Sequence, residues 1–84
     1  MEQFETGMMA RSKSGHDAGK VYVITKVEEA YVYLVDGKVR TLDKPKKKKK
    51  KHVQFIKESF DIQGATDVDI KRWIKIWNKE DNQN

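Results

Sequence analysis

Cysteine is absent from this 84-residue sequence, and histidine occurs only at His16 and His52. Without cysteine the chain has no disulfide bond, no thiolate ligand for zinc and no cysteine nucleophile. Two histidines are too few to favour a metal site, and the sequence contains neither a P-loop nor a dinucleotide fingerprint. We therefore expect a protein that is not an enzyme and that holds neither a metal nor a cofactor.

Long apolar segments are absent as well. No stretch approaches the roughly 20 apolar residues of a membrane-spanning helix, and residues 1–15 lack the apolar part of a signal peptide. A small domain without disulfide bonds is typical of a reducing compartment, so we expect a soluble, cytoplasmic protein that is a monomer when free. A single domain of this size buries only about 60% of its unfolded surface, which disfavours a large enclosed catalytic cleft.

Positive charge is concentrated in one segment of the chain. Seven of the 18 basic residues are lysines between Lys44 and Lys51, interrupted only by Pro45. Without these seven, 11 basic residues remain against 13 acidic ones, a net charge of −2 compared with +5 for the whole chain. Such a concentrated field favours a polyanionic partner, with nucleic acid as the first candidate. A membrane surface is disfavoured, because no lipidation signal or amphipathic anchor accompanies the lysines.

Strand patterns dominate the first two thirds of the sequence. β-branched and aromatic residues, separated by turn residues, predict five short strands at 8–13, 20–27, 30–35, 38–42 and 52–56. Asp36-Gly37 predicts a primed turn between the third and fourth strands, because glycine accepts positive φ without steric cost. Five short strands indicate a mainly β protein with a small closed or half-open barrel, and closure would protect the strand edges.

A helical pattern follows the strands. Thr66 and Asp69 have the spacing of a capping box, and the next apolar residues fall on one helical face: Ile70, Trp73, Ile74 and Trp77. We expect an amphipathic helix that packs on the barrel or docks on a partner protein. In the second case Trp73 and Trp77 are the protein-interaction residues.

The expected organisation therefore has five consecutive parts. They are a flexible tail at 1–6, a barrel at 7–57 with a basic loop at 44–51, a linker at 58–65, a helix at 66–79 and a polar tail at 80–84.

The lysine run is the first candidate binding site. Six consecutive ammonium groups repel one another, so we expect a solvated, extended loop whose lysines bind phosphate and release counterions. The alternative is a loop that only keeps the protein soluble, but a solubility device would be dispersed and mixed in sign. Such lysines position a nucleic acid without reading its bases. The candidate RNA-binding lysines are Lys44, Lys46, Lys47, Lys48, Lys49, Lys50 and Lys51.

The loop before residue 20 is the second candidate. Its order Gly15-His16-Asp17-Ala18-Gly19-Lys20, between an alternating and an apolar strand, resembles a KOW motif, and the similarity continues through Asp36-Gly37-Lys38-Val39-Arg40 and the lysine run to His52. This order is similar to small KOW-domain proteins related to the large-subunit ribosomal protein of the L-fourteen-e type. The resemblance implies an SH3-like barrel that binds RNA, commonly ribosomal RNA. It adds the RNA-binding candidates Arg11, Lys13, Ser14, His16, Lys20 and Arg40. From local chemistry alone, an ordinary turn in which Asp17 caps a backbone amide explains the loop equally well.

Three tyrosines have two possible roles. Tyr31 and Tyr33 share one strand face, opposite in phase to Val32 and Leu34. Together with Tyr22 they either pack the barrel or offer a platform on which RNA bases stack. Our leading hypothesis is a protein that binds ribosomal RNA mainly through its phosphates. The alternative is a transcription- or ribosome-associated adaptor whose tryptophan helix binds a ribosomal or transcription-related protein.

Overall fold

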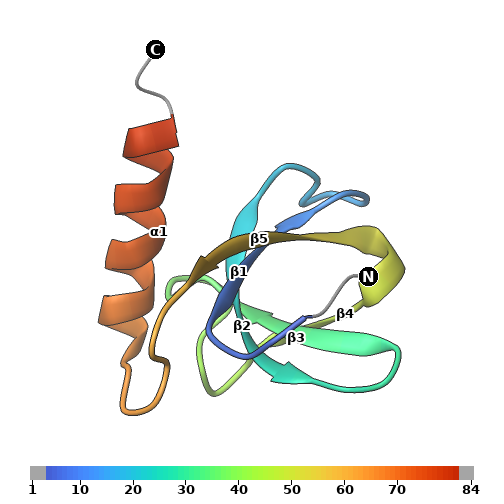
Figure 1. Cartoon of the computed structure of the whole chain (residues 1–84), viewed down its shortest axis with the longest axis horizontal. Coiled ribbons are helices and arrows are strands. Elements are labelled where there is room, and N and C mark those ends of the chain that lie inside the picture. The colour runs from blue at the N-terminus through green and yellow to red at the C-terminus, as the bar shows by residue number, and fades with distance from the viewer. Residues whose placement is uncertain (1–3, 82–84) are drawn as a thin grey trace.

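The computed structural model describes residues 4–81, and residues 1–3 and 82–84 lie outside the described part of the chain. Its elements are β1 (Met8–Ser12), β2 (Val21–Val27), β3 (Tyr31–Val35), β4 (Lys46–Lys49), the 3₁₀ turn η1 (Lys50–His52), β5 (Val53–Ser59) and α1 (Asp67–Asp81). Figure 1 shows a curved sheet with α1 standing beside it. The expected mainly β protein with a C-terminal helix is confirmed.

All five strands form one antiparallel sheet in the order β4-β3-β2-β1-β5. The pairing register shifts between Met8 and Met9 and between Ile24 and Lys26, and such irregularities bend a strand and increase its twist. The strands β4 and β5 lie at opposite ends of this order and do not pair with each other, although η1 joins them directly. The sheet therefore curls without closing, so the closed form of the expected barrel is wrong.

The concave face of the sheet holds one apolar cluster. Alternation along the strands directs six buried side chains to this face: Ala10, Tyr22, Ile24, Val32, Leu34 and Val53. Phe4 packs against the same cluster and meets Phe55 edge to face, with ring centroids 5.5 Å apart. Phe4, within the expected tail at 1–6, is therefore in contact with the core, and residues 1–3 of that tail lie outside the described part.

The opposite face packs against α1. Met9, Val23 and Val35 contribute buried side chains from the strands, and Ile70 is buried from the helix. Trp73 lies flat on Phe60, with ring centroids 4.6 Å apart and planes inclined by 4°. The structure therefore places the predicted apolar stripe of the helix on the protein's own sheet, which was one of the two arrangements considered.

The predicted strand at 38–42 does not form. The Asp36 side chain accepts hydrogen bonds from the backbone amides of Lys38 and Arg40, at 2.8 and 2.9 Å, and the Asp36 amide donates to the Arg40 carbonyl. These bonds close a compact turn, as aspartate commonly does. As a result β3 pairs with the lysine strand β4, with Tyr33 opposite Lys47. The expected basic loop at 44–51 is therefore wrong for residues 46–49.

The predicted capping box is confirmed. The Thr66 amide donates to Asp69 Oδ2 at 3.0 Å, and the Asp69 amide donates to Thr66 Oγ1 at 3.3 Å. The helix starts at Asp67 and extends to Asp81, two residues beyond the expected end at 79, so the expected polar tail at 80–84 is helical at 80 and 81. The expected linker at 58–65 is shorter, because β5 continues through Ser59.

Candidate nucleic-acid interface

Strand geometry divides the lysine run into two sets. Successive side chains of a strand point to opposite faces, and in β4 the half-buried and exposed lysines alternate. Lys46 and Lys48 pair in register with Leu34 and Val32, which are core residues of the concave face. Lys47 and Lys49 point the other way. The lysines of the run would be interchangeable in a solvated loop. In the strand they are not.

A single buried carboxylate is the shared counter-charge of the inward set. Asp17 Oδ2 lies 2.8 Å from Lys46 Nζ, and Asp17 Oδ1 lies 3.2 Å from Lys48 Nζ. The Asp17 side chain is 7% exposed and that of Lys48 only 11%. Lys48 also donates to the Ser14 carbonyl at 3.0 Å. Because an unpaired buried charge is costly, Asp17 is what allows lysine to occupy these strand positions.

Two hydroxyl groups complete the surroundings of Asp17. Ser12 Oγ donates to Oδ1 at 2.9 Å and the Tyr22 hydroxyl donates to Oδ2 at 3.0 Å. Burial alone would raise the pKa of Asp17, but the bonds from Lys46, Ser12, Lys48 and Tyr22 together hold it well below the usual range. Burial and the neighbouring Asp17 carboxylate raise the pKa of Tyr22 to about 12. Near neutral pH the Asp17 carboxylate is therefore ionised, and the Tyr22 hydroxyl keeps its proton.

The outward set lies beside two half-exposed aromatic rings. Lys47 Nζ is 4.4 Å from the centroid of the Tyr31 ring and 5.9 Å from that of Tyr33, while Lys26 Nζ is 5.3 Å from the Tyr33 ring. These separations are typical of cation–π contacts. Lys49 stands opposite Tyr31 in the register. We call these five residues the lysine–tyrosine face: Lys26, Tyr31, Tyr33, Lys47 and Lys49.

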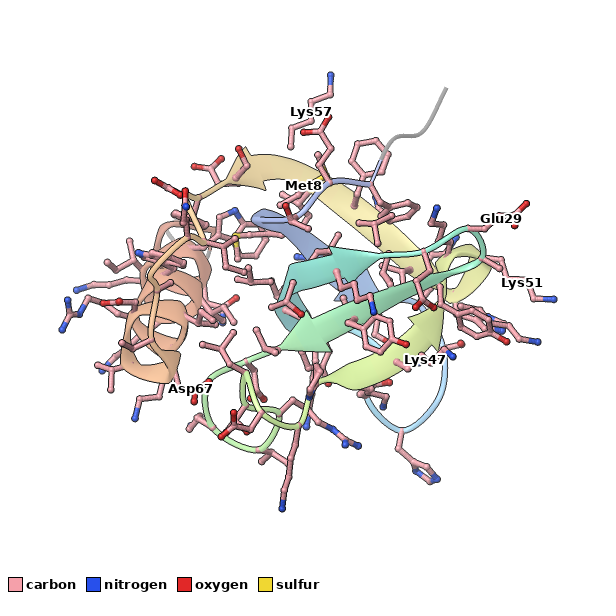
Figure 2. The ribbon with its side chains drawn as sticks, turned by 90° about the horizontal axis from the view of Figure 1, so that it is seen from below. Met8, Glu29, Lys47, Lys51, Lys57 and Asp67 are labelled. Carbon is pink, nitrogen blue, oxygen red and sulfur yellow. The ribbon has the colours of Figure 1, made fainter. Side chains whose placement is uncertain are left out.

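One carboxylate borders this face. Glu28 Oε2 lies 3.5 Å from Lys26 Nζ and accepts a weak bond from the Tyr33 hydroxyl at 3.4 Å. Within the described part of the chain, Lys47 and Lys49 make no ion pair. Figure 2 shows Lys47 and Lys51 at the end of the molecule opposite α1, with Glu29 nearby and Lys57 on another side. The face therefore presents uncompensated positive charge beside two half-exposed rings.

The other predicted residues of this region flank β4 or lie in the loop after β1. Lys44 and Lys51 are exposed, and Lys50 is half-buried with its Nζ 5.9 Å from the Phe4 ring. Lys13 is exposed and its amide donates to the His52 carbonyl, next to η1. His16 is exposed in the loop that carries Asp17. Lys44, Lys50 and Lys51 adjoin β4 in the chain, and Lys13 and His16 belong to the loop whose Asp17 and Ser14 contact Lys48.

Arg11 and the tryptophans lie elsewhere. The Arg11 guanidinium is 5.4 Å from the Trp77 ring, and its Nε is buried without a hydrogen-bond partner among the described residues. Trp73 and Trp77 pack against the sheet, as described above. Arg40 is half-buried in the turn closed by Asp36. Lys20 is exposed at the start of β2, next to α1. These residues are not part of the lysine–tyrosine face.

Sequence reasoning missed two features of this interface. Asp17 appeared only as a possible cap of a backbone amide, whereas it is the counter-charge of a strand about 30 residues later in the chain. Lys26 was not a candidate. Strict alternation from Tyr22 and Ile24 would place Lys26 on the concave face, and only the register shift between Ile24 and Lys26 sets it beside Tyr33.

The interface offers ammonium groups and aromatic rings. No cluster of three histidine or acidic residues within the described range could hold a metal ion. No described helix is long and apolar enough to cross a membrane. No protein-family model matches the chain, and no curated protein shows a significant match to it.

Proposed function

We propose that this chain is a non-enzymatic RNA-binding protein whose lysine–tyrosine face binds single-stranded segments of RNA, with ribosomal RNA as the first candidate. The observation that carries the proposal is the placement of Lys47 within 4.4 Å of the Tyr31 ring, on a face where two lysines have no described ion-pair partner. Proteins that bind single strands combine a positively charged surface with aromatic rings on which bases stack.

The fold supports the same proposal. A five-stranded curled sheet, with a one-turn helix between its last two strands, is compatible with the SH3-like barrel that the KOW resemblance implies. Ribosomal RNA is preferred because of that resemblance. The adaptor alternative has less support, since the tryptophan stripe that it would use is packed on the sheet.

The proposal is tested with a double variant, Lys47→Gln and Lys49→Gln, which removes two exposed charges without disturbing Asp17. Binding of a fluorescent single-stranded RNA is measured by anisotropy over a salt series. We expect affinity to fall about tenfold at low salt and the log–log salt slope to become shallower by about 1.4, since each phosphate contact on a single strand contributes about 0.7. The matched control removes two exposed charges elsewhere, through Lys57→Gln and Arg72→Gln.

Stacking is tested separately by Tyr31→Ala. Loss of one stacked base costs about 1–3 kcal/mol of RNA binding, whereas binding of heparin, a polyanion without bases, is expected to stay unchanged. Equal losses for both ligands would show a purely electrostatic surface. Wild-type affinity for RNA in the double variant Lys47→Gln and Lys49→Gln would overturn the proposed function.

A ribosomal partner has its own test. A tagged chain is crosslinked to RNA in cells, and the bound RNA is sequenced alongside sedimentation of ribosomes at low and high salt. Enrichment of ribosomal over messenger RNA, with co-sedimentation that salt reverses, is the expected result. Recovery of no ribosomal RNA at low salt would remove the ribosome from the proposal.

A further inference from the structure

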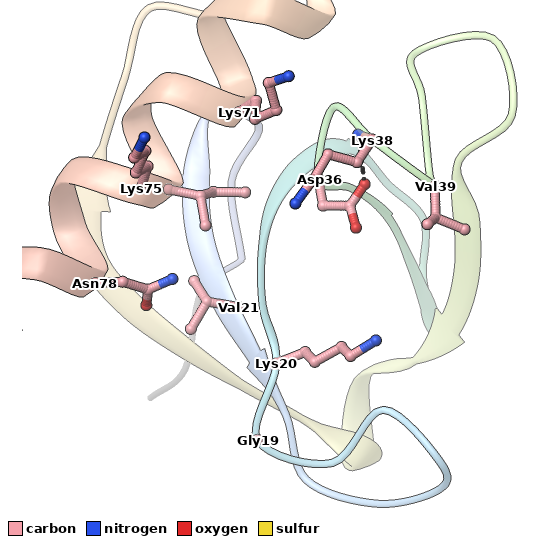
Figure 3. Close-up of a pocket in the computed structure, with 10 residues that line it drawn as sticks. Gly19, Lys20, Val21, Asp36, Lys38, Val39, Lys71, Lys75 and Asn78 are labelled. Carbon is pink, nitrogen blue, oxygen red and sulfur yellow. Dashed lines mark hydrogen bonds between the residues drawn. The ribbon is translucent and has the colours of Figure 1, made fainter.

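A second basic surface lies on the other side of the molecule, where α1 faces the start of β2 and the turn after β3. A groove of about 700 Å³ opens there. Four lysines from three separate segments line it, and we call it the helix groove: Lys20, Lys38, Lys71 and Lys75. Figure 3 shows Lys71 and Lys75 along the helix, Lys38 on the opposite turn and Lys20 at one end. None of the residues 44–51 lines it.

The groove carries a net positive charge, with four lysines against one aspartate in its lining. Asp36 is the one acidic residue in its lining, and its carboxylate already accepts the amides of Lys38 and Arg40. Among the described residues, none of the four lysines forms an ion pair. Four ammonium groups that share one carboxylate leave an excess of positive charge, which raises the local concentration of anions. A bound phosphate chain would relieve their mutual repulsion.

The walls of the groove are held at a fixed separation. Gly37 has a φ of 80° and lies so close to the first turn of α1 that a Cβ atom there would overlap the Asp67 carbonyl. Asp67 Oδ1 also accepts the Leu42 amide at 2.8 Å. The turn at 36–40 and the helix therefore form one unit, so the lysines on both walls are positioned before a ligand arrives, which lowers the cost of binding.

The groove also has apolar surface. Val21 and Ile74 lie in its lining, and Val39 at its rim is 78% exposed, the most exposed large apolar side chain described. Charged walls with apolar patches suit a ligand that alternates phosphates with sugars and bases. The loop at 13–20 connects this groove to the lysine strand, because Lys20 lines the groove while the Ser14 carbonyl accepts a bond from Lys48.

We propose that the helix groove is a second RNA-backbone site, which holds another segment of the strand bound at the lysine–tyrosine face. This inference rests on the proposed function and extends it. Lys71 and Lys75 contact phosphates from the helix, and Lys20 and Lys38 contact them from the opposite side. The helix then has two roles, since one face packs the sheet and the next binds RNA.

Two RNA lengths separate this site from the first. The probes are single-stranded oligouridylates of about 5 and about 16 nucleotides, which bracket typical site sizes on small single-strand-binding domains. The variant carries Lys71→Gln and Lys75→Gln, both exposed helix positions, and the charge-matched control carries Lys57→Gln and Arg72→Gln. Circular dichroism melting confirms that each variant keeps its helix.

We expect the groove variant to lose about tenfold in affinity for the long probe and to show a salt slope shallower by about 1.4. Its affinity for the short probe stays within twofold of wild type. The double variant Lys47→Gln and Lys49→Gln is expected to lose affinity for both probes. A groove variant that matches the charge control on the long probe overturns the second site but leaves the first intact.

Two other results would also overturn the assignment. Equal losses of affinity for the short and the long probe would show that the groove does not bind a further segment of the strand. Tight binding of uridine monophosphate by the wild-type chain, abolished in the groove variant, would show a pocket for a free nucleotide. Unchanged binding in the Lys47 and Lys49 variant would instead reject the lysine–tyrosine face, which keeps the two failures distinct.

Discussion

At the scale of single residues, Asp17 has the largest structural role. Its carboxylate joins the loop after β1 to β2 through Tyr22 and to β4 through two lysines. Removing one partner of a buried pair leaves the other charge without compensation, and this costs more than the pair itself contributes. Asp17 thus holds the two inward lysines of β4, and strand alternation directs Lys47 to the opposite face.

The first prediction replaces Asp17 with asparagine. We expect Asp17→Asn to lower the free energy of unfolding by about 3 kcal/mol at pH 7, because Lys46 and Lys48 lose their counter-charge. Urea unfolding followed by tryptophan fluorescence measures the loss. The control Asp43→Asn makes the same charge change at an exposed position. Equal stability of the two variants would contradict the assigned role.

The second prediction concerns pH. The pKa of Asp17 is depressed in the folded protein, so its contribution to stability is present above the unfolded-state value of about 3.9 and is lost as pH falls below it. The difference in unfolding free energy between wild type and Asp17→Asn should therefore be constant from pH 7 to about pH 5. It should shrink progressively below about pH 4, because protonated aspartic acid resembles asparagine. A difference that does not change with pH would contradict the depressed pKa.

At the scale of elements, the lysine strand has two roles, one in the sheet and one in the proposed binding. As β4 it occupies one edge of the sheet, and charged side chains on an edge discourage pairing with another chain. The same charges on its outward face remain available to a polyanion. The helix is a second composite element, with Ile70 fully buried and Ile76 49% exposed only six residues later.

The third prediction uses this contrast within α1. Ile70→Ala should lower the free energy of unfolding by about 3 kcal/mol, because it leaves a cavity between helix and sheet. Ile76→Ala changes the same side chain on the exposed face and should cost less than about 0.5 kcal/mol. Urea unfolding of both variants measures the difference. Similar small losses would show that the helix is not docked in solution.

At the scale of the whole molecule, positive charge occupies two surfaces rather than one. The lysine–tyrosine face lies at the end opposite α1, and the helix groove lies beside α1 (Figure 2, Figure 3). A long RNA that contacts both surfaces should respond to salt more steeply than either surface alone.

The fourth prediction gives that response. For a long single strand that engages about six lysines, the log–log salt slope of the association constant should be near −4, from about −0.7 per contact. Anisotropy titrations between 50 and 300 mM salt measure it. Combining the four glutamine substitutions at Lys47, Lys49, Lys71 and Lys75 should bring the slope to about −1.4. A wild-type slope near −1 would contradict a two-surface interface.

Local pattern alone determined the strands around Val21 and Tyr31 and the helix with its capping box at Thr66, because alternation and helical spacing follow from neighbouring residues. It also indicated a polyanionic partner, since the concentration of lysines in one segment is visible in the sequence itself. It was wrong for the lysine segment and for residues 38–42. The lysine segment depends on its bonds to Asp17, whereas repulsion between neighbouring lysines had suggested a loop. Residues 38–42 depend on the hydrogen bonds of the Asp36 turn.

Only the tertiary structure decided which lysines are free. The alternation of β4 assigns Lys46 and Lys48 to a carboxylate about 30 residues earlier in the chain, and leaves Lys47 and Lys49 beside two tyrosines. It also gathers Lys20, Lys38 and Lys71 into one groove. Pairings between distant residues leave no periodic signal in a sequence, because their energy depends on the distance between side chains in space.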